Sequence, residues 1–374
     1  MAPVTVLLTL MGLGIGGAET HVVVLAGHLK ELGYRVLIAS SGGAYEETVA
    51  RQGIRHYSVP LDNSRLSSVI QSVSAVRKII KSEKVDLIHA HARIPAFICD
   101  LARQFAGVPM ITTAHAMFAA GFHLRSLSRW GEKTIVISSD IKEYMIKCFR
   151  VPESNITLIH NGIDLEMFNP ALSVGDLVEE LKGDSNRNLI INISRLDKRL
   201  APVSSSLIEA CEYLYADFPT IRLIIVGDGD CAREVADQAR GVNARTSSEL
   251  VRLLGARTDV NRIMVAGDLI VGVSRVALEA MASGRNIILA GGEGYGGLIS
   301  EGSLALFEKD NFTGRQFKNQ VTASNLVDAI REFLCLPLEQ RKQMEILLRK
   351  YIVENYSSIK MAKDTARVYQ EVLA

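Results

Sequence analysis

Three basic residues follow an apolar run in the second half of the chain, where the segment SRLDKRLAP comes directly after residues 188–193. Arg195, Lys198 and Arg199 supply guanidinium and ammonium groups that can neutralise a diphosphate. Charged residues in a loop are usually solvated. The position at the carboxyl end of a predicted strand favours a binding role most clearly for Arg195.

A glycine-rich segment, GGEGYGGLI, comes after the apolar run 287–290. A simple turn with so many glycines would cost considerable chain entropy. We therefore predict a loop that brings backbone N–H groups against a phosphate or a sugar. Its residues are Gly291, Gly292, Glu293, Gly294, Tyr295, Gly296 and Gly297.

A second glycine-rich turn follows the first apolar run, and its residues Gly12, Gly14 and Gly17 match the dinucleotide fingerprint GxGxxG. That fingerprint requires an acidic residue at the end of the next strand, but the sequence there is IASSGG, with no acid before Glu46. A tight turn that packs a helix on a strand explains Gly12 and Gly14. Gly16 and Gly17 look more like part of a phosphate-binding helix N-terminus.

Three histidines, His89, His91 and His115, lie at or after the carboxyl ends of two predicted strands. Three imidazoles can bind a metal, but the first two are only two residues apart and no nearby carboxylate completes a motif. We therefore predict no metal site, a structural role for His89 and a ligand contact for His115.

Residues 267–284 read as a strand, a turn, a helix and a glycine stop before the strand 287–290. Ser274 and Arg275 form the corner at the carboxyl end of the first strand, where open α/β sheets bind ligands. Glu279 lies one helical turn further on. Its carboxylate can accept hydrogen bonds from sugar hydroxyls. Alternatively, Glu279 is a solvated residue in the first turns of the helix, where the helix dipole stabilises a negative charge.

Alternating strands and helices run along nearly the whole chain and predict an α/β fold with parallel sheets. A polar stretch, residues 184–187, separates two such series. We expect two Rossmann-like doubly wound domains that face a cleft. Their boundaries are residues 1–170 and 171–355, with a final helix at 356–374.

Length and composition agree with this division, because 374 residues are too many for one ordinary core. The net charge of +1 gives no sign of nucleic-acid binding. Five scattered cysteines without CxxC spacing fit neither a disulfide scaffold nor a zinc site, and they favour a reducing cytoplasm.

The apolar N-terminus lacks the basic leader and cleavage region of a signal peptide. No apolar run reaches the roughly 20 residues that span a bilayer. Residues 121–133 include Arg125, Arg129 and Trp130 and read either as a plain solvated helix or as a basic helix near a membrane. We expect a cytoplasmic protein, at most peripheral at the inner face of the membrane.

Four stretches spread along the chain give it a recognisable resemblance: GGAETHVVVLAGHLKELGYRV, ISSDIKEYMI with HNGIDLEMF, ISRLD, and LEAMASG. In this order they resemble the retaining glycosyltransferases of family 4, which have the GT-B fold. The resemblance implies transfer of a sugar from a nucleotide-diphosphate donor, UDP- or GDP-linked, with retention and without a metal or other cofactor. It also implies that the last helix returns to the N-terminal domain.

The resemblance assigns roles to five residues. Gly16 and Gly17 resemble the glycine loop beside the donor phosphate and the acceptor, and His115 resembles the histidine near the donor sugar. Arg195 matches the arginine that holds the diphosphate, and Glu279 matches the second glutamate of an E-x7-E pair, which binds the ribose.

Two positions depart from the family pattern. Leu200 stands where the family has a lysine, so we assign its role to Lys198 or Arg199. Val271 stands where the first glutamate of the pair is expected. Glu293 has a carboxylate that could take the place of this missing glutamate. The alternatives are that Ser274 and Arg275 bind the donor in a different way, or that the protein has lost transferase activity.

The leading prediction is therefore a transferase that acts on a carbohydrate or lipid-linked acceptor, such as a cell-envelope precursor. A GT-B sugar-nucleotide epimerase or hydrolase and a non-catalytic partner of another transferase are the alternatives. An NAD-dependent oxidoreductase ranks last because of the IASS strand end.

Overall fold

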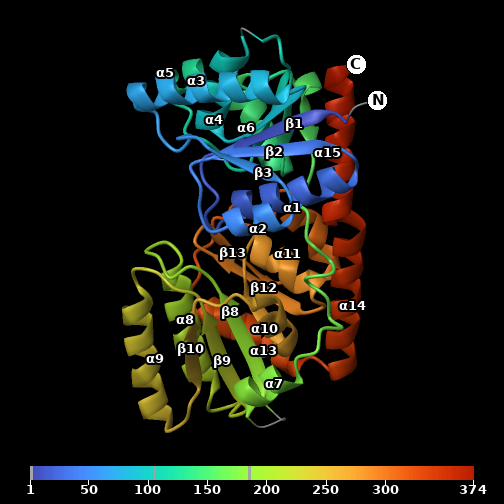
Figure 1. Cartoon of the computed structure of the whole chain (residues 1–374). Coiled ribbons are helices and arrows are strands. Elements are labelled where there is room, and N and C mark those ends of the chain that lie inside the picture. The colour runs from blue at the N-terminus through green and yellow to red at the C-terminus, as the bar shows by residue number, and fades with distance from the viewer. Residues whose placement is uncertain (1–2, 105, 184–186) are drawn as a thin grey trace. The chain divides into compact units, whose positions relative to one another are not determined.

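The computed structural model of the chain describes residues 3–104, 106–183 and 187–374 (Figure 1). It divides into two compact units. The N-terminal unit comprises Met1–Asp164 and Tyr356–Ala374, and the C-terminal unit comprises Leu165–Asn355. Most of the polar stretch predicted to separate the two series, residues 184–186, lies outside the described residues.

The N-terminal unit is built on one sheet in which every described strand pairing is parallel. The strand order, β3-β2-β1-β4-β5-β6-β7, reverses between β1 and β4. Side chains of β1 alternate between the faces, with Val6 and Leu8 in one core and Leu7 in the other. The strands are β1 (Thr5–Leu10), β2 (Arg35–Ser40), β3 (Arg55–Ser58), β4 (Leu87–His91), β5 (Met110–Ala114), β6 (Lys133–Val136) and β7 (Ile156–Leu158).

Helices cover both faces of this sheet (Figure 1). The core on one face is formed with α1 and α15, and the core on the other with α3 and α4. The helices of the unit are α1 (Gly17–Glu31), α2 (Glu46–Arg51), α3 (Leu66–Glu83), α4 (Arg93–Arg103), α5 (Phe122–Leu127), α6 (Ser139–Phe149), the short η1 (Glu153–Asn155) and α15 (Ser358–Leu373).

The last helix, α15, belongs to the N-terminal unit although it ends the chain. Ile163 forms a bridge with Ser357, and beyond it Met361, Ala362 and Tyr369 enter the core that contains α1. The hydroxyl of Tyr369 also makes a buried hydrogen bond of 2.7 Å with Nδ1 of His89 in β4. The end of the chain therefore completes the N-terminal core.

The C-terminal unit has a second sheet, in the order β10-β9-β8-β11-β12-β13, which reverses between β8 and β11. Its described pairings are parallel except for β13, which runs antiparallel to β12. The strands are β8 (Asn188–Ile193), β9 (Ile221–Val226), β10 (Val251–Gly255), β11 (Leu269–Gly272), β12 (Asn286–Gly291) and β13 (Gly294–Leu298).

The strand β13 corrects the prediction that residues 291–297 form a loop. Residues 294–298 pair with β12, so the chain makes a tight hairpin at Gly292 and Glu293 in place of an open loop. The sequence pattern hid this strand because glycines are usually depleted from strands.

Helices again flank the second sheet, and its core holds residues of α8, α9 and α13 together with β8 and β11. No described helix is both long and apolar enough to cross a membrane. The helices are α7 (Gly175–Lys182), α8 (Ala201–Leu214), α9 (Ala232–Thr246), α10 (Val260–Ala266), α11 (Arg275–Ala282), the short η2 (Glu301–Ser303), α12 (Leu304–Glu308), α13 (Ala323–Cys335) and α14 (Leu338–Asn355).

Candidate functional site

Arg195 lies directly beyond β8, at the point where the strand order of the C-terminal sheet reverses. Its side chain is 72% exposed, and its Nε lies 3.8 Å from Oδ2 of Asp197. The other oxygen of Asp197 accepts the backbone N–H groups of Arg199 and Leu200, each at 3.0 Å, which fixes the loop that leads into α8. These hydrogen bonds lower the pKa of Asp197. Hydrogen bonds thus hold the loop while the arginine is accessible.

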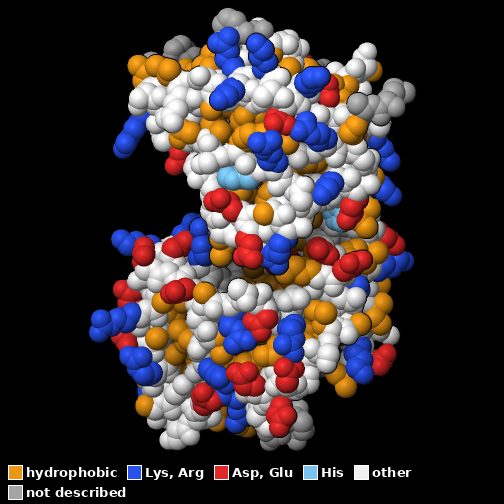
Figure 2. Space-filling view, viewed as in Figure 1, with side chains coloured by type: hydrophobic (Ala, Val, Ile, Leu, Met, Phe, Trp, Pro, Cys, Tyr) orange, Lys and Arg blue, Asp and Glu red, His pale blue; other side chains and the backbone are white. Residues whose placement is uncertain are grey.

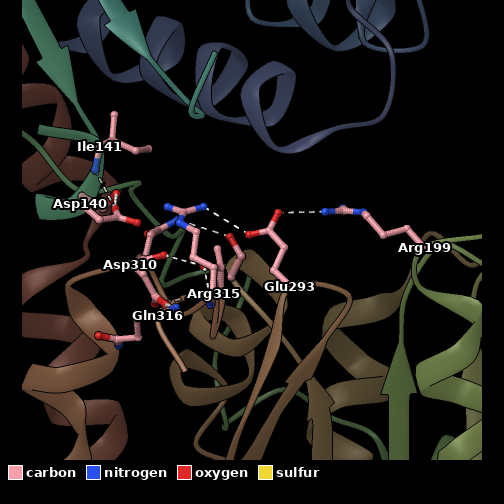
Figure 3. A network of polar contacts seen from close by, with 11 residues as sticks. Asp140, Ile141, Arg199, Glu293, Asp310, Arg315 and Gln316 are labelled. Atoms are coloured by element: carbon pink, nitrogen blue, oxygen red, sulfur yellow. Dashed lines mark hydrogen bonds and ion pairs between the residues drawn. The ribbon is translucent and has the colours of Figure 1, made fainter. Parts of the chain in front are cut away.

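Glu293 joins two arginines from separate parts of the C-terminal unit (Figure 3). Its Oε1 accepts from Nη1 of Arg199 at 2.9 Å, and its Oε2 accepts from Nη1 of Arg315 at 3.4 Å. Arg315 lies within a turn in which Asp310 accepts the backbone N–H of Gln316 at 3.2 Å. Positive charge therefore gathers around one carboxylate at the hairpin between β12 and β13.

A pocket of about 280 Å³ opens beside this hairpin. Arg199, Glu293 and Lys318 contribute the charged part of its lining, and Gly291, Gly292 and Gly294 contribute backbone. Two cations against one carboxylate suit an anionic ligand. Lys198 is exposed on the loop that leads to α8 and does not line this pocket.

Packing explains several of the hairpin glycines. A Cβ at Gly292 would lie 2.7 Å from the carbonyl oxygen of Arg199, and one at Gly291 would lie 2.6 Å from Cγ1 of Val273. A Cβ at Gly294 would clash with the carbonyl oxygen of Gly314, and one at Gly296 with the ring of Phe307. Close approach of the chain to itself is a sufficient reason for these glycines.

Backbone conformation and a hydrogen bond give structural reasons for two further residues of the hairpin strand. Gly297 has a φ of +78°, which favours glycine. The Tyr295 hydroxyl donates to the carbonyl oxygen of Asn325 at 2.7 Å, and burial raises its pKa to about 12. A contact of these residues with a ligand stays a prediction.

Ser274 and Arg275 form the corner between β11 and α11, on the other side of the strand-order reversal from Arg195. Ser274 has a φ of +53°, a strained value for a residue other than glycine. Its backbone N–H donates to the carbonyl oxygen of Phe312 at 2.6 Å, and its hydroxyl accepts from Asn311 at 3.3 Å. Backbone strain of this kind is often found at functional sites.

Arg275 is paired with Glu279 one turn further along α11, with Nε 2.6 Å from Oε1. Burial raises the pKa of Glu279, and the guanidinium of Arg275 opposes that rise. The Nη1 of Arg275 is buried and has no hydrogen-bond partner among the described residues. Val271, which stands where the resemblance expects a second carboxylate, is fully buried in β11.

In the N-terminal unit, Gly16 is the N-cap of α1 and Gly17 is its first residue. A Cβ at Gly16 would meet the carboxylate of Glu19, which is the far end of a flexible side chain and can move aside. A Cβ at Gly17 would meet nothing within 4 Å. Packing therefore does not explain Gly17, and its open surroundings leave room for a ligand at the helix N-terminus.

His115 follows β5 and is only half-buried, and its Nε2 lies 3.1 Å from Nδ1 of His91 at the end of β4. Desolvation lowers the pKa of His115 to about 4, so the imidazole is neutral at pH 7. His89 is buried between Tyr369 and the hydroxyl of Thr113, each 2.7 Å from one of its ring nitrogens. A structural role for His89 fits these contacts.

Known families match the two units separately. Residues 15–167 match the sequence model of Glycosyltransferase Family 4, and residues 187–334 match that of Glycosyl transferases group 1. The chain is a family 4 glycosyltransferase.

Relatives of the transferase include a UDP-Gal:alpha-D-GlcNAc-diphosphoundecaprenol alpha-1,3-galactosyltransferase of Escherichia coli, which is 28% identical over 66% of this chain and 68% of its own. The N-acetyl-alpha-D-glucosaminyl L-malate synthase of Bacillus anthracis is 22% identical over 96% of this chain and 95% of its own.

Solved structures confirm the GT-B fold. A glycosyltransferase from Rickettsia africae ESF-5 superimposes with a TM-score of 0.81 at 20% identity, covering 100% of this chain and 99% of the other. Anabaena Alr3699/HepE in complex with UDP and glucose superimposes with a TM-score of 0.76 at 17% identity, covering 98% and 99%.

The structure of the transferase brings several predicted residues together and adds others. Arg199 meets Glu293, and Arg275 meets Glu279. Sequence reasoning missed Arg315 and Lys318, because no motif marks the turn that brings them to the hairpin. It also did not consider His21, which lies on α1 and which the structure places close to His91 and His115.

An apolar pocket of about 390 Å³ lies in the N-terminal unit of the transferase, between α3, α4 and α5. Arg93 is the charged residue of its described lining. Leu66, Ile70 and Leu127 are exposed on α3 and α5. Figure 2 shows hydrophobic and basic side chains together on the surface of this part of the unit. The pocket lining is Ser64, Leu66, Val69, Arg93, Ile94, Phe97, Leu101, Leu124 and Leu127.

Proposed function

We propose that the transferase moves a sugar from a nucleotide-diphosphate sugar to a carbohydrate or lipid-linked acceptor, with retention and without a metal. The observation that carries this proposal is the group of basic side chains at the carboxyl edge of the C-terminal sheet. Arg195 is exposed at the strand-order reversal, and Arg199, Arg315 and Lys318 surround or adjoin the hairpin pocket.

Departure of the nucleoside diphosphate builds negative charge on its phosphate oxygens. Fixed cations that meet this charge stabilise the transition state more than the ground state, which is how they accelerate the reaction. Arg195 suits this role because its guanidinium is accessible and the adjoining loop is held by Asp197. Lys198 and Arg199 take the place of the lysine that the family has at Leu200.

Glu293 and Glu279 are the carboxylates assigned to the donor. In this proposal Glu293 accepts a hydrogen bond from a sugar hydroxyl when the diphosphate draws Arg199 away from it. Glu279 binds the ribose, and Arg275 fixes the orientation of its carboxylate. Gly16, Gly17 and His115 of the N-terminal unit serve the acceptor and the transferred sugar.

A UDP-linked donor and a lipid-linked acceptor are the preferred substrate classes. The Anabaena neighbour binds UDP, and the Escherichia coli relative is named for a UDP-linked donor and a diphosphoundecaprenol-linked acceptor. The apolar pocket of the N-terminal unit, with Arg93 in its lining, suits a hydrocarbon chain next to an anionic group. Exposed apolar and basic side chains there also favour peripheral association with a membrane.

The test is a transfer assay with UDP-, GDP- and ADP-sugars and a short-chain lipid diphosphate-sugar acceptor, with and without EDTA. We expect transfer from one donor, undiminished by EDTA, and an α-linked product from an α-linked donor by NMR. Donor turnover that needs no acceptor would identify a hydrolase or epimerase instead. An inverted linkage, or activity abolished by EDTA and restored by Mg²⁺, would contradict the retaining and metal-independent parts of the proposal.

A further inference from the structure

Three histidines from separate elements converge near the strand-order reversal of the N-terminal sheet. His21 lies on α1, His91 ends β4 and His115 follows β5. One ring nitrogen of each lies within 4.8 Å of those of the other two. We call these residues the histidine triad. Unlike the trio considered from the sequence, it contains His21 in place of His89.

The spacing of the triad is close to that of a zinc site. Zinc–nitrogen bonds of about 2.0–2.1 Å place neighbouring ligands of a tetrahedral ion roughly 3.3 Å apart. His91 and His115 already have nitrogens 3.1 Å apart. The rings of His21 and His115 are in edge contact, with centroids 4.8 Å apart, so a side-chain rotation that brings their nitrogens closer would complete the arrangement.

Hydrogen bonds within the described part of the protein leave His91 incompletely satisfied. His91 is 1% exposed, and its Nε2 is buried without a hydrogen-bond partner among the described residues. The 3.1 Å contact of its Nδ1 with His115 joins two nitrogens and uses a single proton. A buried imidazole that makes one bond at most is costly, because most buried polar atoms in proteins are paired.

The surroundings orient the triad as second-shell groups orient metal ligands. Nδ1 of His21 lies 3.1 Å from the amide oxygen of Asn161, which can only accept, so Nδ1 carries the proton and Nε2 carries the lone pair. His89 uses both nitrogens for Tyr369 and Thr113 and stays outside the triad.

We propose that the histidine triad binds one Zn²⁺ ion, with the fourth coordination position open to water or a substrate group. Three neutral imidazoles and one open position are a common ligand set for zinc. This proposal departs from the expectation that the chain holds no metal. It also has a consequence that rests on the proposed function: zinc occupies His115, so it inhibits transfer.

The test uses the full-length protein, freed of metal by EDTA and desalting. Co²⁺ is added as a spectroscopic substitute, and Zn²⁺ is titrated against a chromophoric chelator. We expect one equivalent of each metal and a visible Co²⁺ absorption of tetrahedral type without a thiolate charge-transfer band. Since each is a ligand, His21→Gln and His115→Gln should each weaken Zn²⁺ binding at least about tenfold.

The matched control is His28→Gln, which lies two turns from His21 on α1 and instead contacts Glu31 and Ser358. It should bind Zn²⁺ as the unchanged protein does. Circular dichroism identifies any variant that fails to fold, and the Co²⁺ spectrum of the unchanged protein tests the ligand set without a variant. Less than stoichiometric binding, a thiolate band, or full affinity in both folded triad variants would overturn the proposal. None of these readouts needs a transfer assay, so a failure here is distinct from a failure of the proposed function.

Discussion

Arg275 and Glu279 form an ion pair one helical turn apart in α11, with Nε 2.6 Å from Oε1 and side chains that are only 19% and 11% exposed. The pair lies where the strand order of the C-terminal sheet reverses, beside the proposed donor site. A buried pair is weak evidence for stability, because desolvation of both charges offsets their attraction. Loss of either residue would nevertheless leave the other as an uncompensated buried charge.

Removing one partner of this pair should destabilise the C-terminal unit. We expect Arg275→Met to lower the free energy of unfolding by about 3 kcal/mol at pH 8, because Glu279 remains as a buried, unpaired carboxylate. The double substitution Arg275→Met with Glu279→Leu should recover most of this loss. Urea unfolding followed by circular dichroism measures both. A single variant as stable as the unchanged protein would show that the pair is not buried as described.

The same pair predicts a pH dependence with a definite sign. Burial raises the pKa of Glu279 above its ordinary value of 4.5. Between pH 4.5 and the raised folded pKa, the folded protein therefore binds more protons than the unfolded protein. The contribution of Glu279 to stability is therefore fully present below pH 4.5 and is lost as the pH rises through the raised folded pKa. The slope is at most about 1.4 kcal/mol per pH unit. Glu279→Gln should remove this component from the pH profile of urea unfolding, and an unchanged profile would contradict the assignment.

Arg195 should matter for turnover and not for folding. Its guanidinium is largely exposed, so Arg195→Ala should change stability by no more than about 0.5 kcal/mol. Loss of a cation that stabilises the departing diphosphate should lower kcat by about 10²–10³-fold. Arg240→Ala is the matched control, since Arg240 is equally exposed and lies beside an aspartate on α9. Near-normal kcat in Arg195→Ala would refute its assigned role.

Glu293 allows the proposed exchange of partners to be tested. Glu293→Gln should lower kcat/KM by about 10–100-fold, since a hydrogen bond to a charged group contributes about 1.5–3 kcal/mol. Stability should change by less than about 1 kcal/mol, because its ion pairs are partly exposed. Glu180→Gln, which also removes an arginine partner, is the control. Equal kinetics for the two variants would reduce Glu293 to a surface ion pair.

Tyr369 ties the last helix to the first sheet through one buried hydrogen bond. Tyr369→Phe leaves Nδ1 of His89 unpaired and should cost about 1–3 kcal/mol of unfolding free energy. Tyr213→Phe removes an exposed hydroxyl and should cost nearly nothing. Thermal unfolding of both variants at pH 7 measures the difference. Equal stability of the two variants would show that water replaces the lost hydroxyl.

Hydrophobic patterning was enough to predict the parallel strands, because buried strands such as β1 and β8 are short, mainly apolar runs. It failed at β13, where glycines pack against Phe307 and Gly314 and conceal the strand. Packing partners that lie ten or more residues away leave no local signal.

The residues of the candidate sites also fall into a group that the sequence could predict and a group that it could not. Arg195 and Ser274 could be placed from the ends of strands, because topology brings those ends together. The partners of Glu293 and the triad member His21 could not. Arg315 lies 3.4 Å from Glu293 through a turn of the chain, and His21 reaches the triad from the inward face of a helix. Both relationships depend on tertiary structure alone.

The return of α15 to the N-terminal unit sets an order on folding during synthesis. The C-terminal unit is one continuous segment, Leu165–Asn355, and can close its core without α15. The first unit to be translated must wait, since Met361, Ala362 and Tyr369 belong to its core. Its apolar surface therefore stays open longest in the nascent chain. A premature stop after Asn355 would leave the C-terminal unit complete, whereas the N-terminal unit would lack α15 and expose part of its core.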